Sequence, residues 1–94
     1  MEESPAMVRK RVVIHGRVQG VFFRDSLRRR AREHGVAGWA ANRSDGAVEA
    51  VLEGSAEAVD RVLSFCESGP PHATVENVEV SDEEPGGLSG FDIR

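Results

Sequence analysis

Residues 12–24 read Val-Val-Ile-His-Gly-Arg-Val-Gln-Gly-Val-Phe-Phe-Arg, and they set out how the chain begins to fold. The β-branched run at 12–14 is typical of a strand, whereas Phe23, Leu27 and Ala31 recur at the spacing of one helix face. A glycine-bracketed loop therefore joins a strand to the start of a helix. Such a loop brings unpaired backbone N–H groups and the positive end of the helix dipole to one point. The sequence predicts a site for a small oxyanion there.

The loop amides and one side chain are predicted to hold this anion. Glycines at both ends of the loop let the backbone curl and approach a ligand closely. An arginine at the mouth of the helix offers a planar fork of donors that suits phosphate or carboxylate. The predicted anion-binding residues are Gly16, Arg17, Val18, Gln19, Gly20, Val21 and Arg24.

Periodicity and turn residues predict the remaining elements. Asp45-Gly46 predicts a hairpin turn, and Ser55 is a typical N-cap for the second helix. A slip in the apolar phase between Val75 and Val78 predicts a bulge in the fourth strand. The predicted elements are strands at 8–15, 36–42, 47–53, 74–80 and 91–93, and helices at 22–34 and from 56 to about 68.

The predicted third strand alternates cleanly, which favours a sheet with one solvated face. The inward set is Val48, Ala50 and Leu52, and the outward set is Glu49, Val51 and Glu53. The stretch 81–90 is acidic and glycine-rich, and we expect a loop there.

The element order βαββαβ with a short extra C-terminal strand predicts an α+β fold. It matches the ferredoxin-like sandwich, in which two helices cover one face of a mostly antiparallel sheet. We expect one domain over residues 1–94, with residues 1–6 as a flexible leader. This fold serves many functions, so it does not identify one.

Composition narrows the classes of function. The chain has 94 residues and a formal net charge of −4, which argues against a general nucleic-acid binder. A single cysteine, Cys66, excludes an internal disulfide framework and fits a reducing compartment, so we expect a cytoplasmic location. No run is apolar enough for a membrane span or a signal peptide. The three histidines and the cysteine show no metal-ligand spacing.

Two motifs together resemble the signatures of the acylphosphatases. The first is residues 16–24, and the second is residues 38–49, which read Gly-Trp-Ala-Ala-Asn-Arg-Ser-Asp-Gly-Ala-Val-Glu. The resemblance runs from about Val8 through Val80 to the closing residues 91–94. It implies a stand-alone enzyme that hydrolyses the carboxyl–phosphate anhydride of acyl phosphates.

The resemblance also implies the roles of individual residues. Arg24 and the loop amides from Gly16 to Val21 would bind the phosphoryl group, and Asn42 would position the attacking water. A phosphate oxygen of the substrate would take the proton from this water, without a metal or another cofactor. The chemistry is consistent with these roles, since an acyl phosphate already carries a good leaving group and needs mainly positioning and charge stabilisation.

Two alternatives stay open from the sequence. A single-strand RNA-binding module can share the element order, but it would display aromatic residues on its central strands. Here the candidate strands carry only Trp39 and, at the end of the chain, Phe91. A non-catalytic accessory domain that binds phosphate or acyl phosphate is the other. We expect a small-molecule acyl phosphate as the partner, no nucleic acid or membrane, and a monomer.

Overall fold

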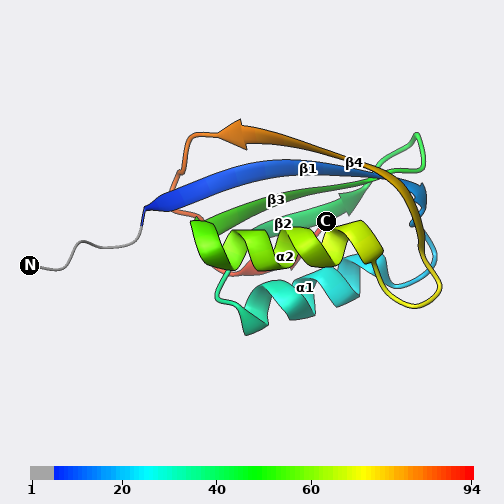
Figure 1. The fold of residues 1–94 in the computed structure, drawn as a ribbon, viewed down its shortest axis with the longest axis horizontal. Coiled ribbons are helices and arrows are strands. Elements are labelled where there is room, and N and C mark those ends of the chain that lie inside the picture. The colour runs from blue at the N-terminus through cyan, green and yellow to red at the C-terminus, as the bar shows by residue number, and fades with distance from the viewer. Residues whose placement is uncertain (1–5) are drawn as a thin grey trace, which may run out of the picture.

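The computed structural model describes residues 6–94, in which two helices pack on a five-stranded sheet (Figure 1). Apart from Ala6, the predicted leader lies outside the described residues. The elements in chain order are β1 (Met7–Arg17), α1 (Phe23–Glu33), β2 (Ala37–Asn42), β3 (Val48–Ser55), α2 (Ala56–Ser68), β4 (Thr74–Glu83) and β5 (Phe91–Ile93).

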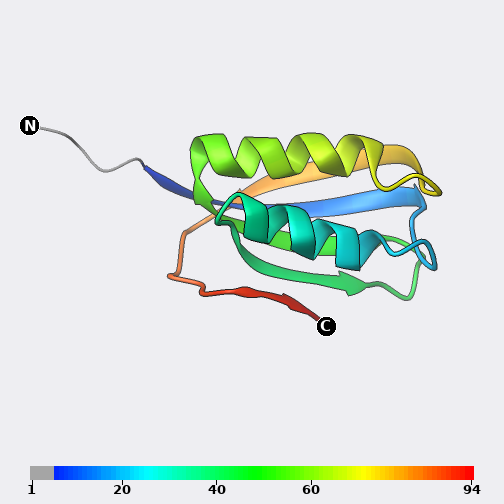
Figure 2. The same cartoon turned by 90° about the horizontal axis from the view of Figure 1, so that it is seen from below.

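The strands follow the order β4-β1-β3-β2-β5 across the sheet. Neighbouring strands are antiparallel except β2 and β5, which are parallel. Both helices lie on the same face of the sheet, and in Figure 2, seen from below, both lie in front of the strands. The predicted ferredoxin-like sandwich is confirmed, and β5 is the predicted extra strand.

The core lies between the helices and the sheet. On β1, Val12 and Ile14 are fully buried, as their alternation predicts. Burial of one such side chain contributes roughly 1.5–3 kcal/mol. The apolar faces of both helices point into this core: Phe23, Leu27 and Ala31 from α1, as their spacing predicts, and Val59, Val62 and Cys66 from α2.

The predicted N-cap of α2 is confirmed, and a glycine follows the end of α1. The Ser55 hydroxyl accepts a hydrogen bond from the N–H of Ala58 at 3.2 Å, which satisfies a free amide at the start of α2. Gly35 follows α1 with a φ of 67°, a left-handed conformation that glycine adopts without strain. Among residues 6–94, no helix combines the length and the apolar character that crossing a membrane requires.

The predicted bulge in β4 is confirmed. His15 pairs with Asn77 and Gly16 pairs with Val75, so Glu76 is an extra residue on β4. Gly16 lies opposite this bulge, and a Cβ built on it would stand 2.2 Å from the carbonyl oxygen of Thr74. The close approach of the two strands therefore requires glycine at this position.

The prediction that Val51 and Glu53 face solvent is wrong. Both are buried, although they point away from the helices. Arg11 and Trp39 flank Val51 in the register of the sheet, and the Arg11 guanidinium extends over the Trp39 ring at 5.6 Å. Arg11 also pairs with Glu49 and Glu83, which raises its pKa. Long side chains and ion pairs thus cover the centre of the face without helices.

The predicted loop at 81–90 is only partly correct. Residues 81–83 continue β4, so the connection to β5 spans only residues 84–90. The buried Glu53 carboxylate holds this connection, because it accepts hydrogen bonds from the N–H groups of Gly86 at 2.8 Å and Leu88 at 2.7 Å. It also pairs with Arg9 at 2.8 Å. The N–H of Gly86, assisted by Arg9 and Leu88, lowers the pKa of Glu53.

Candidate active site

In the described chain, the loop between β1 and α1 contains backbone N–H groups that have no backbone partner. Gly20 and Phe22 both adopt left-handed conformations, with φ of 74° and 61°, and they turn the chain sharply into the helix. Phe22 is the N-cap of α1, and its side chain caps none of the helix amides. Among the described residues, the first loop or helix amide with a backbone partner is that of Ser26, which donates to the Phe22 carbonyl. The preceding amides are therefore available to a ligand.

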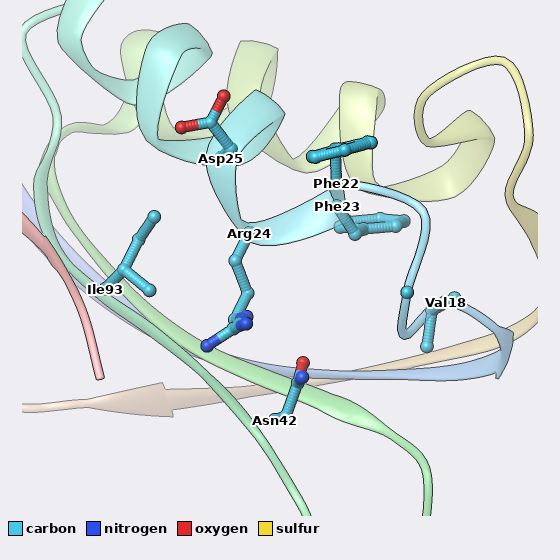
Figure 3. A pocket seen from close by; sticks show the side chains of 8 residues that line it. Val18, Phe22, Phe23, Arg24, Asp25, Asn42 and Ile93 are labelled. Atoms are coloured by element: carbon cyan, nitrogen blue, oxygen red, sulfur yellow. The ribbon is translucent and has the colours of Figure 1, made fainter.

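Arg24 lies in the first turn of α1, next to these amides. Figure 3 shows its side chain extending from the helix toward Asn42. One guanidinium nitrogen, Nη1, donates to the main-chain oxygen of Arg94 at 3.1 Å. This bond uses one of the five guanidinium donors, so the others remain for an anion. The side chain is half-buried, which strengthens its attraction for an oxyanion relative to a fully solvated arginine.

Asn42 is the last residue of β2 and is exposed at the edge of the cavity. The turn that follows it is held by Asp45, whose carboxylate accepts from the N–H of Ala47 at 3.1 Å and pairs with Arg43 at 2.9 Å. The Ala47 N–H, with Arg43, lowers the pKa of Asp45. Asn42 presents a neutral amide, which can donate and accept hydrogen bonds. The Arg24 side chain extends toward this amide (Figure 3).

A cavity of about 300 Å³ joins these parts. Residues from the loop, α1, β2 and β5 form its wall: Val18, Gly20, Phe22, Phe23, Arg24, Asp25, Asn42 and Ile93. Of the predicted site residues, Val18, Gly20, Arg24 and Asn42 are thus brought together. Gly16, Arg17, Gln19 and Val21 do not line the cavity.

Two of the predicted residues that do not line the cavity belong to β1 and not to the loop. Gly16 and Arg17 continue the strand and pair with Val75 and Thr74 of β4. The glycine at position 16 therefore serves the contact between two strands, whereas Gly20 has no atom within 4 Å of an added Cβ and serves the turn of the loop. Glycine thus suits the two positions for different reasons: the close approach of two strands at Gly16 and the left-handed turn at Gly20.

Four residues of the wall were not predicted from the sequence: Phe22, Phe23, Asp25 and Ile93. Phe22 and Asp25 adjoin predicted site residues, and proximity in the chain could have indicated them. Ile93 could not be found in this way, because only the pairing of β5 with β2 brings it to the site.

The Asp25 carboxylate pairs with Arg28 at 2.6 Å and with Arg29 at 3.6 Å. Its negative charge is thereby offset beside the cavity.

His15 and Cys66 do not line the cavity. His15 contacts Glu79 at 2.6 Å, and Cys66 is buried in the core, where burial raises its pKa to about 12. Within residues 6–94, no three side chains of His, Cys, Asp or Glu gather as a metal ion would require. The arrangement thus offers backbone amides, a guanidinium and a neutral amide, which together suit a phosphoryl group and a water beside it.

Comparison with known proteins agrees with this geometry. Residues 10–93 match the family description Acylphosphatase. A curated acylphosphatase from Rubrobacter xylanophilus is 57% identical over 100% of this chain and 86% of its own length. The solved acylphosphatase from Coxiella burnetii is 36% identical, covers 94% of this chain and 93% of its own, and superposes with a TM-score of 0.90. The acylphosphatase from Bacillus subtilis is 33% identical with the same TM-score, over 93% of this chain and 98% of its own. Because the likeness runs through both motifs and the whole described fold, the chain belongs to the acylphosphatase family of hydrolases.

Proposed function

We propose that this chain hydrolyses acyl phosphates to a carboxylate and inorganic phosphate by direct attack of water. One observation carries the proposal: Arg24 and Asn42, which lie far apart in the sequence, line one cavity (Figure 3), and in the described residues the adjoining loop has backbone amides without a backbone partner. Arg24 and the amides after β1 would hold the phosphoryl oxygens. Asn42 would hold the water.

The reaction forms a bond between the water oxygen and phosphorus and breaks the bond between phosphorus and the acyl oxygen. The carboxylate leaves with the electron pair of the broken bond. Arg24 and the amides stabilise negative charge on the phosphoryl oxygens as the transition state loosens. A phosphoryl oxygen accepts the proton that the water loses. Asp25, the carboxylate in the wall, is engaged by Arg28 and is therefore a poor general base.

Asn42 suits a positioning task better than an acid would. Its amide is uncharged, so it can lie beside the phosphoryl group without repulsion. Because water placement matters mainly in the transition state, Asn42→Ala should lower kcat about 100-fold and leave the affinity for inorganic phosphate within about twofold. Asn77→Ala, on the strand at the opposite edge of the sheet, is the matched control and should retain both. A parallel loss of phosphate affinity would make Asn42 a binding or structural residue.

Substitution of Arg24 should weaken phosphate binding and also lower turnover. Arg24→Ala removes a side-chain cation of the cavity and should weaken inorganic phosphate binding at least about tenfold as well as turnover. Arg61→Ala, an exposed arginine on α2, is the control. Benzoyl phosphate is a convenient substrate, and isothermal titration with inorganic phosphate measures binding separately. Normal activity of Arg24→Ala would refute the site.

The same measurements decide between the enzyme and a non-catalytic phosphate-binding domain. Phosphate binding without turnover in the folded wild-type chain would favour the second. The test is done with and without a chelator, because the proposed reaction uses no metal or cofactor. Activity that a chelator abolishes would contradict this.

The surroundings of Trp39 and Phe91 bear on whether the chain binds a nucleic acid or a small molecule. Trp39 has the guanidinium groups of Arg94 and Arg11 over its ring, at 4.4 Å and 5.6 Å, and Phe91 is buried, so neither aromatic ring is free to stack on a base. We propose a small-molecule partner and no nucleic acid. The exposed large apolar side chains of the described residues, Met7, Phe22 and Val80, belong to three separate elements or loops, which supports a monomer acting as a single domain. The free, buried Cys66 supports a cytoplasmic location.

A further inference from the structure

The side chain of Gln19 is directed at the β2–β3 turn. Its amide nitrogen, Nε2, donates to the carbonyl oxygens of Arg43 at 2.7 Å and Ala47 at 3.0 Å. These two residues bracket the turn that follows Asn42. Both donors of the Gln19 amide are thus used on a segment more than twenty residues away in the sequence. The loop that carries the free amides is thereby tied to the hairpin that carries Asn42.

The two acceptors are the carbonyls that close the turn. The oxygen of Arg43 also accepts from the N–H of Gly46 at 3.2 Å, and the oxygen of Ala47 also accepts from the N–H of Arg43 at 2.8 Å. Gln19 therefore adds a second hydrogen bond to each of them. Because its two donors form a rigid fork, both carbonyls must keep their positions relative to the loop.

We infer that Gln19 is a positioning residue for Asn42, and that its side chain serves the placement of the attacking water and not the binding of phosphate. The inference rests on the proposed function, since it assumes that Asn42 orients water at the phosphoryl group. Asn42 is exposed at the end of its strand, where small shifts of the hairpin would move its amide out of line. A displacement of about 1 Å can lower a rate by about 100-fold.

The residue type fits this task. A carboxylate in place of the amide would face two carbonyl oxygens without a proton to donate. Methionine keeps the length and shape of the side chain but offers no N–H donor. Gln19→Met therefore removes the two hydrogen bonds with little change in volume. Ser68→Ala is the matched control, because it removes a side-chain hydrogen bond to a main-chain carbonyl, that of Phe65, at the end of α2.

A double-mutant cycle tests whether Gln19 acts through Asn42. The wild type, Gln19→Met, Asn42→Ala, the double variant and Ser68→Ala are compared for kcat on benzoyl phosphate and for affinity toward inorganic phosphate. Gln19→Met should lower kcat about tenfold and leave phosphate affinity within about twofold. In the Asn42→Ala background, the same substitution should change kcat less than about twofold, because the residue that Gln19 positions is gone. Ser68→Ala should match the wild type.

An equal loss in both backgrounds, or a parallel loss of phosphate affinity, would overturn the inference. A second readout does not depend on activity: amide hydrogen exchange at Arg43 and Gly46 should quicken at least about fivefold in Gln19→Met and not in Ser68→Ala. Unchanged exchange would also overturn it. An inactive wild type, or a fully active Asn42→Ala, would instead refute the proposed function, while the exchange rates would still report whether Gln19 holds the turn.

Discussion

Removal of the Glu53 carboxylate should destabilise the fold by several kcal/mol, although the residue does not line the cavity. The residue is 3% exposed, and its carboxylate accepts three hydrogen bonds, from Arg9, Gly86 and Leu88, at 2.7–2.8 Å. Hydrogen bonds to charged groups contribute about 1.5–3 kcal/mol each, and breaking a buried pair costs about 3–5 kcal/mol. These contributions are not additive, because one substitution leaves the same donors unpaired. We expect Glu53→Ala to lower the free energy of unfolding by about 3–5 kcal/mol.

Urea unfolding at neutral pH measures this loss. Glu57→Gln is the control, since its exposed pair with Arg61 on α2 contributes less than about 1 kcal/mol. The pH dependence gives a second test, with Glu53→Gln as the reference that cannot titrate at this position. The pKa of Glu53 is lowered in the folded state from 4.5, so the carboxylate contributes its full stability above the unfolded pKa. That contribution is lost as the pH falls through the lower, folded pKa.

The advantage of the wild type over Glu53→Gln should therefore be constant above about pH 5.5 and shrink below about pH 4.5. A loss below about 1 kcal/mol in Glu53→Ala at neutral pH would refute this reasoning, as would a difference that does not change at acid pH. The first result would mean that water or another group satisfies the donors of Arg9, Gly86 and Leu88 when the carboxylate is absent.

Three further predictions concern strain and burial. Gly16→Ala should lower the free energy of unfolding by more than about 2 kcal/mol, because its Cβ would meet the Thr74 carbonyl oxygen. Gly20→Ala should lower it by only about 1 kcal/mol, the cost of left-handed strain. Equal losses in urea unfolding would contradict this contrast. Phe22→Asn should raise the unfolding free energy by about 0.5–1 kcal/mol, since asparagine tolerates the φ of 61° better, and calorimetry would show an unchanged or lower Tm if the strain were absent. Cys66 should react with a thiol reagent at neutral pH at least about 100-fold more slowly in the native chain than in urea, because it is buried with a pKa of about 12; rapid native labelling would argue against that burial.

Local patterns determined most of the fold. The spacing of Phe23, Leu27 and Ala31 and the alternation of Val12 and Ile14 identify buried faces, since neighbours three, four or two residues apart share one side of an element. The phase slip in β4 was also readable, because an extra residue changes which side chains face inward. The same local information predicts an oxyanion site at the loop amides and the arginine at the start of α1.

What lay beyond local information was decided by contacts across the sheet. The outward face of β3 was mispredicted because alternation shows which side a residue faces but not what covers that side. Arg11 and Trp39 cover Val51, and the connection at 84–90 folds back onto Glu53. The sequence alone could name Arg24 and Asn42 as separate residues of two motifs. The tertiary structure placed them in one cavity, added Ile93 through the parallel pairing of β5 with β2, and turned Gln19 toward the hairpin, because these arrangements depend on segments that meet only when the sheet is assembled.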